Sequence, residues 1–107
     1  MDEQNPSNSA SFVLKLYDII MKRMAADPAI SYTARLCASG LETILAKVEE
    51  EANEVIEAAR REGRQRLIEE ASDLFYHVFV LLAHEGITLE DIGQELERRH
   101  ARATGSA

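Results

Sequence analysis

Residues 41–85 read LETILAKVEEEANEVIEAARREGRQRLIEEASDLFYHVFVLLAHE, and this stretch decides the fold. Its apolar residues recur at the three-to-four-residue spacing of amphipathic helices. Gly63 interrupts the pattern, and glycine is common just beyond the last turn of a helix. The spacing therefore predicts two helices, over 41–62 and 64–85, which a short turn allows to run antiparallel.

Two weaker helical patterns precede this pair. Ser11 is a suitable N-cap for a helix over 12–26, which the Asp-Pro pair at 27–28 ends because the residue before proline disfavours helical geometry. A connector at 29–33 then leads into a short helix over 34–39. The short helix needs neighbours, since isolated helices of this length are unstable in water.

A last helix is predicted from Thr88 to about His100, with acidic residues in its first turn. Four main helices, a short connector helix and no strand pattern predict an all-α fold, an antiparallel helical bundle. The second half of the 64–85 helix is apolar around its whole circumference, which one short chain cannot cover. We therefore expect a homodimer or larger homo-oligomer that completes the bundle.

The composition is that of one ordinary folded domain. The chain has 107 residues, of which 46% are hydrophobic and 29% charged, well away from compositions that stay disordered. Residues 1–10 are polar and aperiodic, so we expect a disordered leader there, a domain over 11–102 and a loose tail over 103–107.

Net charge and cysteine content limit the possible partners and the cellular location of the protein. A formal net charge of −7 argues against a nucleic-acid partner, which would need clustered Lys and Arg. Cys37 is the only cysteine, so no intrachain disulfide is possible and a reducing, cytoplasmic location is favoured. No apolar run approaches the ~20 residues that span a bilayer, so no membrane partner is expected.

Paired carboxylates stand on the two central helices. At 100° per residue, Glu51 and Glu54 share one ridge, and Glu70 and Asp73 share another. Because the chain reverses at Gly63, the four carboxylates can converge. Like charges at half-buried positions repel each other, so a bound cation would explain them, and oxygen ligands favour Mg²⁺ or Mn²⁺. The same acids would also fit the solvated faces of amphipathic helices.

Three segments resemble a known family. SYTARL at 31–36, KVEEEA at 47–52 and LIEEASDL at 67–74 are similar to phosphoribosyl-ATP pyrophosphohydrolase, one of the MazG-like all-α nucleotide pyrophosphohydrolases. The resemblance spans about residues 12–101. It departs from the family at Glu49, where a glycine is usual, but Glu49 points away from the predicted ligands.

The resemblance implies a reaction and a metal site. The reaction is hydrolysis of the α–β phosphoanhydride of phosphoribosyl-ATP to phosphoribosyl-AMP and pyrophosphate, the second step of histidine biosynthesis. The family's EExxE and ExxD elements would supply the catalytic carboxylates and hold Mg²⁺ or Mn²⁺, and Glu50 is a weaker candidate for the base that activates water. These elements fall at Glu50, Glu51, Glu54, Glu70 and Asp73.

Four further residues are candidates for contact with the nucleotide substrate. Lys47 lies one turn before Glu51 and would contact a phosphate oxygen or form an ion pair with Glu51. Arg35, Tyr32 and Thr33 lie in the segment that carries the family resemblance, where they would grip phosphate or ribose. Tyr32 would equally serve as a core anchor.

Other functions remain open at this point. A relative that cleaves other nucleoside or deoxynucleoside triphosphates would use the same acids, and a dimerising bundle without catalysis would need none of them. A di-iron bundle requires Glu-x-x-His on two helices, and only Glu97 and His100 match. His77 shares a face with Glu70 and Asp73, but Mg²⁺ prefers oxygen, so a hydrogen-bonding or packing role is favoured.

Overall fold

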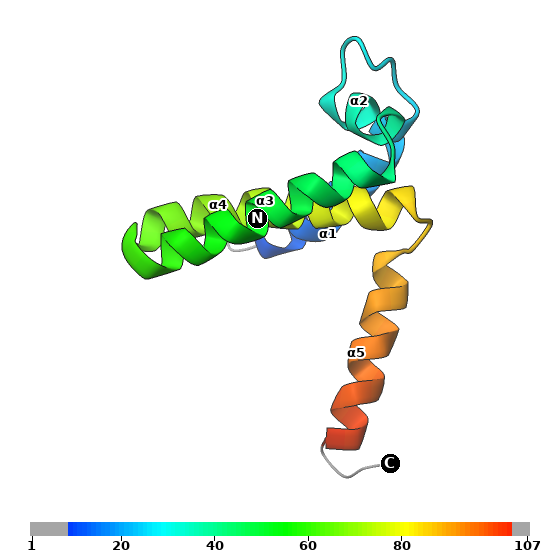
Figure 1. The fold of residues 1–107 in the computed structure, drawn as a ribbon. Helices are drawn as coiled ribbons and strands as arrows, with labels where there is room; N and C mark the ends of the chain where they lie inside the picture. Colours follow the sequence, from blue (N-terminus) through cyan, green and yellow to red (C-terminus); the bar gives the residue numbers. More distant parts are fainter. Residues whose placement is uncertain (1–8, 104–107) are drawn as a thin grey trace, which may run out of the picture.

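The computed structural model describes residues 9–103, and every regular element in that range is a helix. This confirms the predicted all-α class. The parts of the predicted leader and tail at 1–8 and 104–107 lie outside the described residues. The helices are α1 (Ser9–Met24), α2 (Tyr32–Ala38), α3 (Leu41–Arg61), α4 (Arg64–His84) and α5 (Leu89–Ala103), as Figure 1 shows.

The α3–α4 hairpin is the centre of the fold. Gly63 joins the two helices at φ +90°, a left-handed conformation that L side chains rarely adopt. The helices then lie side by side and antiparallel (Figure 1). Ile44 of α3 and Val80 of α4 are 0% exposed, in agreement with the apolar pattern of the two helices. Ala58 of α3 is also 0% exposed, although it lies on the ridge of Glu51 and Glu54 beside the predicted apolar stripe.

Helices α1 and α2 cover one end of this hairpin. The shared core consists of Tyr17 and Ile20 from α1, Leu36 from α2, Ile44 from α3, and Val80 and Ala83 from α4. The Tyr17 hydroxyl donates a hydrogen bond to the backbone carbonyl of Ile87. This bond ties α1 to the loop that follows α4.

Two predicted helix starts were wrong. Helix α1 already includes Ser9, the first residue that the structure describes, so Ser11 lies inside the helix and is not its N-cap. Helix α2 begins at Tyr32 because Ser31 is its N-cap, with the Ser31 hydroxyl oxygen accepting a hydrogen bond from the Ala34 amide at 3.1 Å. Tyr32 and Thr33 therefore belong to the first turn of α2 and not to a connector.

Helix α5 leaves the rest of the chain and contributes no buried residue (Figure 1). The radius of gyration is 16.3 Å, larger than the ~13 Å of a compact 100-residue domain. A single chain thus does not close the predicted bundle of four main helices. The second half of α4 is also only partly covered, and Phe75 is 52% exposed.

None of the helices within residues 9–103 combines the length and the apolar character needed to cross a membrane.

Candidate metal centre

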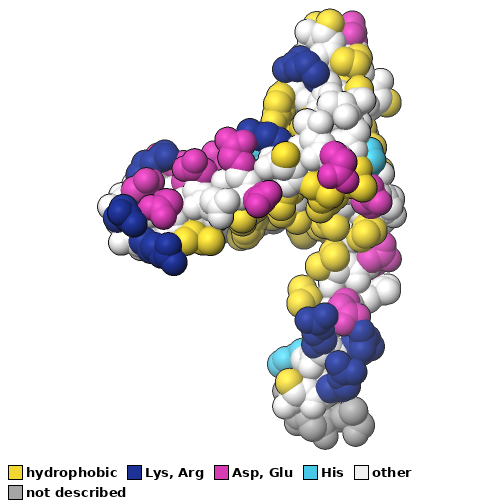
Figure 2. Space-filling view, in the orientation of Figure 1, with side chains coloured by type: hydrophobic (Ala, Val, Ile, Leu, Met, Phe, Trp, Pro, Cys, Tyr) yellow, Lys and Arg dark blue, Asp and Glu magenta, His cyan; other side chains and the backbone are white. Residues whose placement is uncertain are grey.

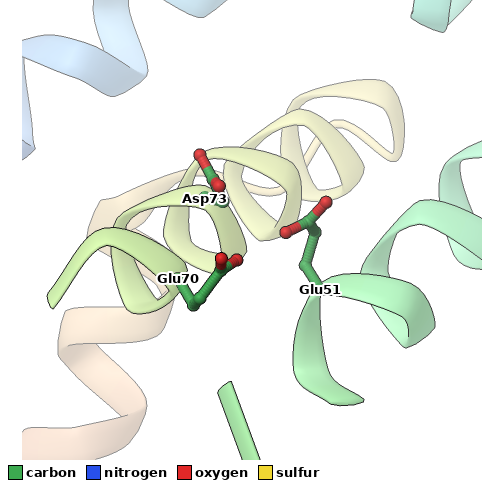
Figure 3. A group of neighbouring side chains, drawn as sticks. All are labelled: Glu51, Glu70 and Asp73. Atoms are coloured by element: carbon green, nitrogen blue, oxygen red, sulfur yellow. The ribbon is translucent and has the colours of Figure 1, made fainter. Parts of the chain in front are cut away.

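Three carboxylates from the two central helices converge. Glu51 extends from α3 toward Glu70 and Asp73 on α4 (Figure 3). One oxygen from each lies within 4.8 Å of the others. Glu51 is 8% exposed and Glu70 7% exposed, whereas Asp73 is exposed. The arrangement follows from the helical spacing on each side of Gly63.

The geometry and the donor atoms fit a hard divalent cation. Oxygens bound to Mg²⁺ lie about 2.0–2.1 Å from it, so two of them are at most about 4.2 Å apart. Among three ligands of an octahedral ion at least two pairs are adjacent, about 2.9 Å apart, so oxygens up to 4.8 Å apart have to move closer by up to about 2 Å, which requires rotation of the side chains. Because burial of paired carboxylates is costly without compensating charge, Glu51 and Glu70 fit such an ion better than they fit a solvated helix face.

The fourth predicted ligand, Glu54, is outside this group. Its side chain is exposed on α3, although its charge is close enough to raise the pKa of Glu70. The four predicted ligands therefore divide into a converging set of three and a nearby fourth. Ligation by Glu54 stays a prediction.

Two cations border the converging acids. Lys47 Nζ lies 3.3 Å from Glu50 Oε1 and 3.6 Å from Glu51 Oε2, so the ion pair expected for Lys47 is present. Arg66 forms an ion pair with the Glu70 carboxylate through its guanidinium. Each cation is on the same helix as its acid, one turn earlier, and each offsets part of the negative charge.

The pKa of Glu70 is raised above the ordinary value for glutamate. Burial is the main cause, and the negative charges of Glu54, Asp73 and Glu51 add to it, while the Arg66 guanidinium acts in the opposite direction. The protein thus holds the ionised form of this carboxyl at a cost. A bound divalent cation would remove that cost.

Two hydrogen bonds connect Tyr32 of α2, through the His77 ring, to the backbone of Asp73 on α4. His77 Nδ1 lies 2.8 Å from the Asp73 carbonyl oxygen, which can only accept, so in the neutral ring Nδ1 carries the hydrogen. The other ring nitrogen, Nε2, then accepts from the Tyr32 hydroxyl at 3.0 Å. Burial raises the pKa of Tyr32, which keeps this donor protonated. The two bonds give His77 the hydrogen-bonding role expected of it.

The remaining predicted substrate residues of α2 have partners within the chain. Thr33 is 2% exposed, and its hydroxyl shares a hydrogen bond with the Tyr76 hydroxyl. Arg35 donates to the Pro28 carbonyl at 2.8 Å, and its guanidinium carbon lies 5.7 Å from the centre of the Tyr32 ring. Substrate contact by Arg35 and Thr33 stays a prediction.

Sequence reasoning gave no role to two side chains near the site. Arg66 is four residues before Glu70, a spacing that marks an ion pair on a helix, so the signal was available. Tyr76 stacks on Tyr32, with ring centres 6.2 Å apart and planes at 25°. No local sequence pattern predicts the contact between Tyr32 and Tyr76, because it depends on how α2 packs against α4.

The fold and the acid cluster together define an all-α protein with carboxylates that converge from two antiparallel helices, an arrangement consistent with the MazG-like nucleotide pyrophosphohydrolases. A model of the family described as phosphoribosyl-ATP pyrophosphohydrolase matches residues 13–100. The chain belongs to this family.

Several relatives support the same assignment. A phosphoribosyl-ATP pyrophosphatase from Leptospira biflexa is 47% identical over 90 residues, which cover 84% of this chain and 98% of the relative. A phosphoribosyl-ATP pyrophosphatase from Pyrobaculum aerophilum is 52% identical over 85 residues, covering 79% and 90%. One from Sulfurisphaera tokodaii is 47% identical over 91 residues, covering 85% and 97%. The similarity extends over nearly the whole length of each relative.

Proposed function

We propose that this protein hydrolyses phosphoribosyl-ATP to phosphoribosyl-AMP and pyrophosphate, the second step of histidine biosynthesis. The observation that carries the proposal is the convergence of Glu51, Glu70 and Asp73 within 4.8 Å in a chain of this family. Transfer of a phosphoryl group requires neutralisation of phosphate charge, and an acid cluster achieves this by holding a metal. A single free cysteine, Cys37, agrees with action in the cytoplasm.

Glu51, Glu70 and Asp73 would hold Mg²⁺ or Mn²⁺, with Glu54 as an additional ligand from the rim. When bound, the ion supplies positive charge to the phosphate oxygens and activates water for attack. The two buried carboxylates would fix the position of the ion, since helix backbone and burial restrict their rotamers. The exposed Asp73 would be the ligand nearest to the substrate.

The charged side chains around the acids have complementary tasks. Lys47 is held by Glu50 and Glu51, and it would turn to a phosphate oxygen once the metal occupies the carboxylates. Glu50, which is exposed, would then be released to accept the proton of the attacking water. Tyr32 would contact the substrate beside Lys47, whose charge already acts on its phenol.

The direct test measures pyrophosphate release from phosphoribosyl-ATP, ATP and deoxynucleoside triphosphates, each with Mg²⁺ and with EDTA. We expect release from phosphoribosyl-ATP with Mg²⁺, and at least about 10³-fold slower release with EDTA, because the carboxylates alone repel the substrate. Preferential cleavage of the ordinary triphosphates would instead identify the protein as a nucleoside triphosphate pyrophosphohydrolase of the same superfamily. Absence of all cleavage would leave a non-catalytic bundle.

We also propose that the protein is a homodimer or a larger homo-oligomer. The support is the extent of uncovered apolar surface in one chain: Phe12, Leu14, Phe75 and Leu96 are each more than half exposed. Figure 2 shows hydrophobic side chains gathered along the lower side of the α1–α4 body, where α5 leaves it. A second copy would cover this surface and give α5 a partner.

Phe75→Glu tests the dimer. Phe75 borders an apolar hollow between α1 and α4 of about 250 Å³, and a carboxylate buried there without a partner is expected to weaken dimerisation by more than about 100-fold. Sedimentation equilibrium of wild type and variant measures this. Asn53→Glu adds the same charge on the polar side of α3 and should leave the dimer intact. A monomeric wild type, or a dimeric Phe75→Glu variant, would contradict the proposal.

A further inference from the structure

An open pocket lies between the end of α1 and the start of α2. Its volume is about 440 Å³, within the ~300–1,000 Å³ typical of small-molecule sites. Tyr32, Thr33 and Tyr76 form one wall, and Arg23 is the only charged residue among those that line it. The stacked rings of Tyr32 and Tyr76 offer the flat apolar surface that a nucleobase or sugar requires.

Among the polar side chains that line this pocket, that of Arg23 is the one without a hydrogen bond or ion pair to another described residue of 9–103. The Ser31 hydroxyl caps α2, the Thr33 and Tyr76 hydroxyls bond each other, and the Tyr32 hydroxyl bonds His77. The guanidinium forms no such bond or ion pair within that range. Because Arg23 is exposed, its donors are open to solvent and accessible to a ligand, and a planar guanidinium matches a phosphate in charge and geometry.

Tyr32 joins this pocket to the acid cluster. Its ring forms part of the pocket wall, and its hydroxyl reaches the His77 ring that is bound to the Asp73 carbonyl. The charges of Lys47 and Glu51 also act on the pKa of its phenol, Lys47 lowering it and Glu51 raising it. The pocket is therefore linked to the helix turn that carries Asp73 through two side chains, Tyr32 and His77. A larger hollow of about 610 Å³ beside α5 includes two carboxylates, Asp18 and Glu90, which disfavour an anionic ligand.

We propose that this pocket receives the phosphoribosyl end of the substrate, with Arg23 paired to its phosphate. The inference rests on the proposed function. Phosphoribosyl-ATP differs from ATP by a second sugar with its own phosphate group, and a chain of net charge −7 needs a local cation to hold that group. Arg23 supplies the cation at one end, while the metal-binding acids hold the triphosphate at the other, so Arg23 determines specificity.

The test compares wild type, Arg23→Gln and Arg23→Lys with phosphoribosyl-ATP at saturating Mg²⁺. We expect Arg23→Gln to raise KM by about 10–100-fold with kcat changed less than about twofold, because a charge-assisted bond to a non-reacting group is lost. Arg23→Lys should recover part of the loss. Competitive inhibition by phosphoribosyl-AMP should weaken by the same factor, whereas inhibition by AMP, which lacks the second phosphate, should not change.

Lys22→Gln is the matched control, because it removes the same charge from the neighbouring residue, which lines the hollow beside α5. Equal effects of the Lys22 and Arg23 variants, or an equal loss of AMP and phosphoribosyl-AMP inhibition, would overturn the inference. An Arg23→Gln variant that matches an active wild type overturns this inference alone. A wild type that leaves phosphoribosyl-ATP intact overturns the proposed function and this inference with it.

Discussion

Glu51→Gln is expected to lower kcat/KM for phosphoribosyl-ATP by about 10²–10³-fold or more, because it removes a ligand charge where phosphate charge must be neutralised. Glutamine keeps the shape of the side chain, and Glu51 is 8% exposed on a helix whose other core positions are untouched. The loss therefore reports on the metal site and not on folding. Steady-state rates over a Mg²⁺ titration measure it, and more Mg²⁺ should restore part of the rate.

Glu49→Gln provides the control for this prediction. It changes the same residue type two positions away, on an exposed part of α3, and it removes the residue that departs from the family pattern. We expect activity close to that of wild type. If Glu51→Gln kept more than half of the wild-type kcat/KM, Glu51 would not be a metal ligand.

Glu70→Gln is expected to abolish activity to a similar extent and yet to leave the metal-free protein equally or more stable. The pKa of Glu70 is raised by burial and by neighbouring acids. An acid with a raised pKa binds its proton more readily in the folded than in the unfolded protein, so at neutral pH its ionised form opposes folding. Glutamine has no charge to bury, and this opposition disappears.

Thermal unfolding with EDTA and with Mg²⁺ tests the second prediction. In EDTA the Tm of Glu70→Gln should equal or exceed that of wild type, while saturating Mg²⁺ should raise the wild-type Tm more than that of the variant. Glu69→Gln is the matched control: it also contacts Arg66, but its pKa is lowered by hydrogen bonds from Gln65 and Arg66. Its removal should cost stability in EDTA and spare activity. A clear drop in the metal-free Tm of Glu70→Gln would show that its ion pair outweighs its burial.

The central hairpin was predictable because its information is local. Helical periodicity and one glycine at 63 place Glu51, Glu70 and Asp73 on facing ridges, and the structure brings these three together. The same reasoning could not separate Glu54 from them. One turn along α3 is enough to move a carboxylate from the side that faces α4 to the side that faces solvent. Which turn still faces α4 depends on the packing angle of the two helices.

Contacts between distant segments were not predictable. The pattern at 29–33 was interpreted as a connector, although Ser31 followed by a helical turn is a recognisable cap. The pairing of Tyr32 with His77 and the pocket beside Arg23 depend on how α2 packs against α4, which no periodicity encodes. The direction of α5 is equally undetermined by its own residues, since an amphipathic helix needs only some apolar surface to cover it.

The three converging acids all belong to one hairpin, whereas Arg23 and the α2 residues near the pocket belong to an earlier part of the chain. Under the two proposals, bond cleavage and substrate choice would be encoded in separate stretches of the gene. Substitution of the exposed Arg23 would then alter which nucleotide is accepted without disturbing the hairpin. A few substitutions outside the hairpin could then change the preferred nucleotide while the catalytic carboxylates stay in place. The same fold could in this way act on several substrates.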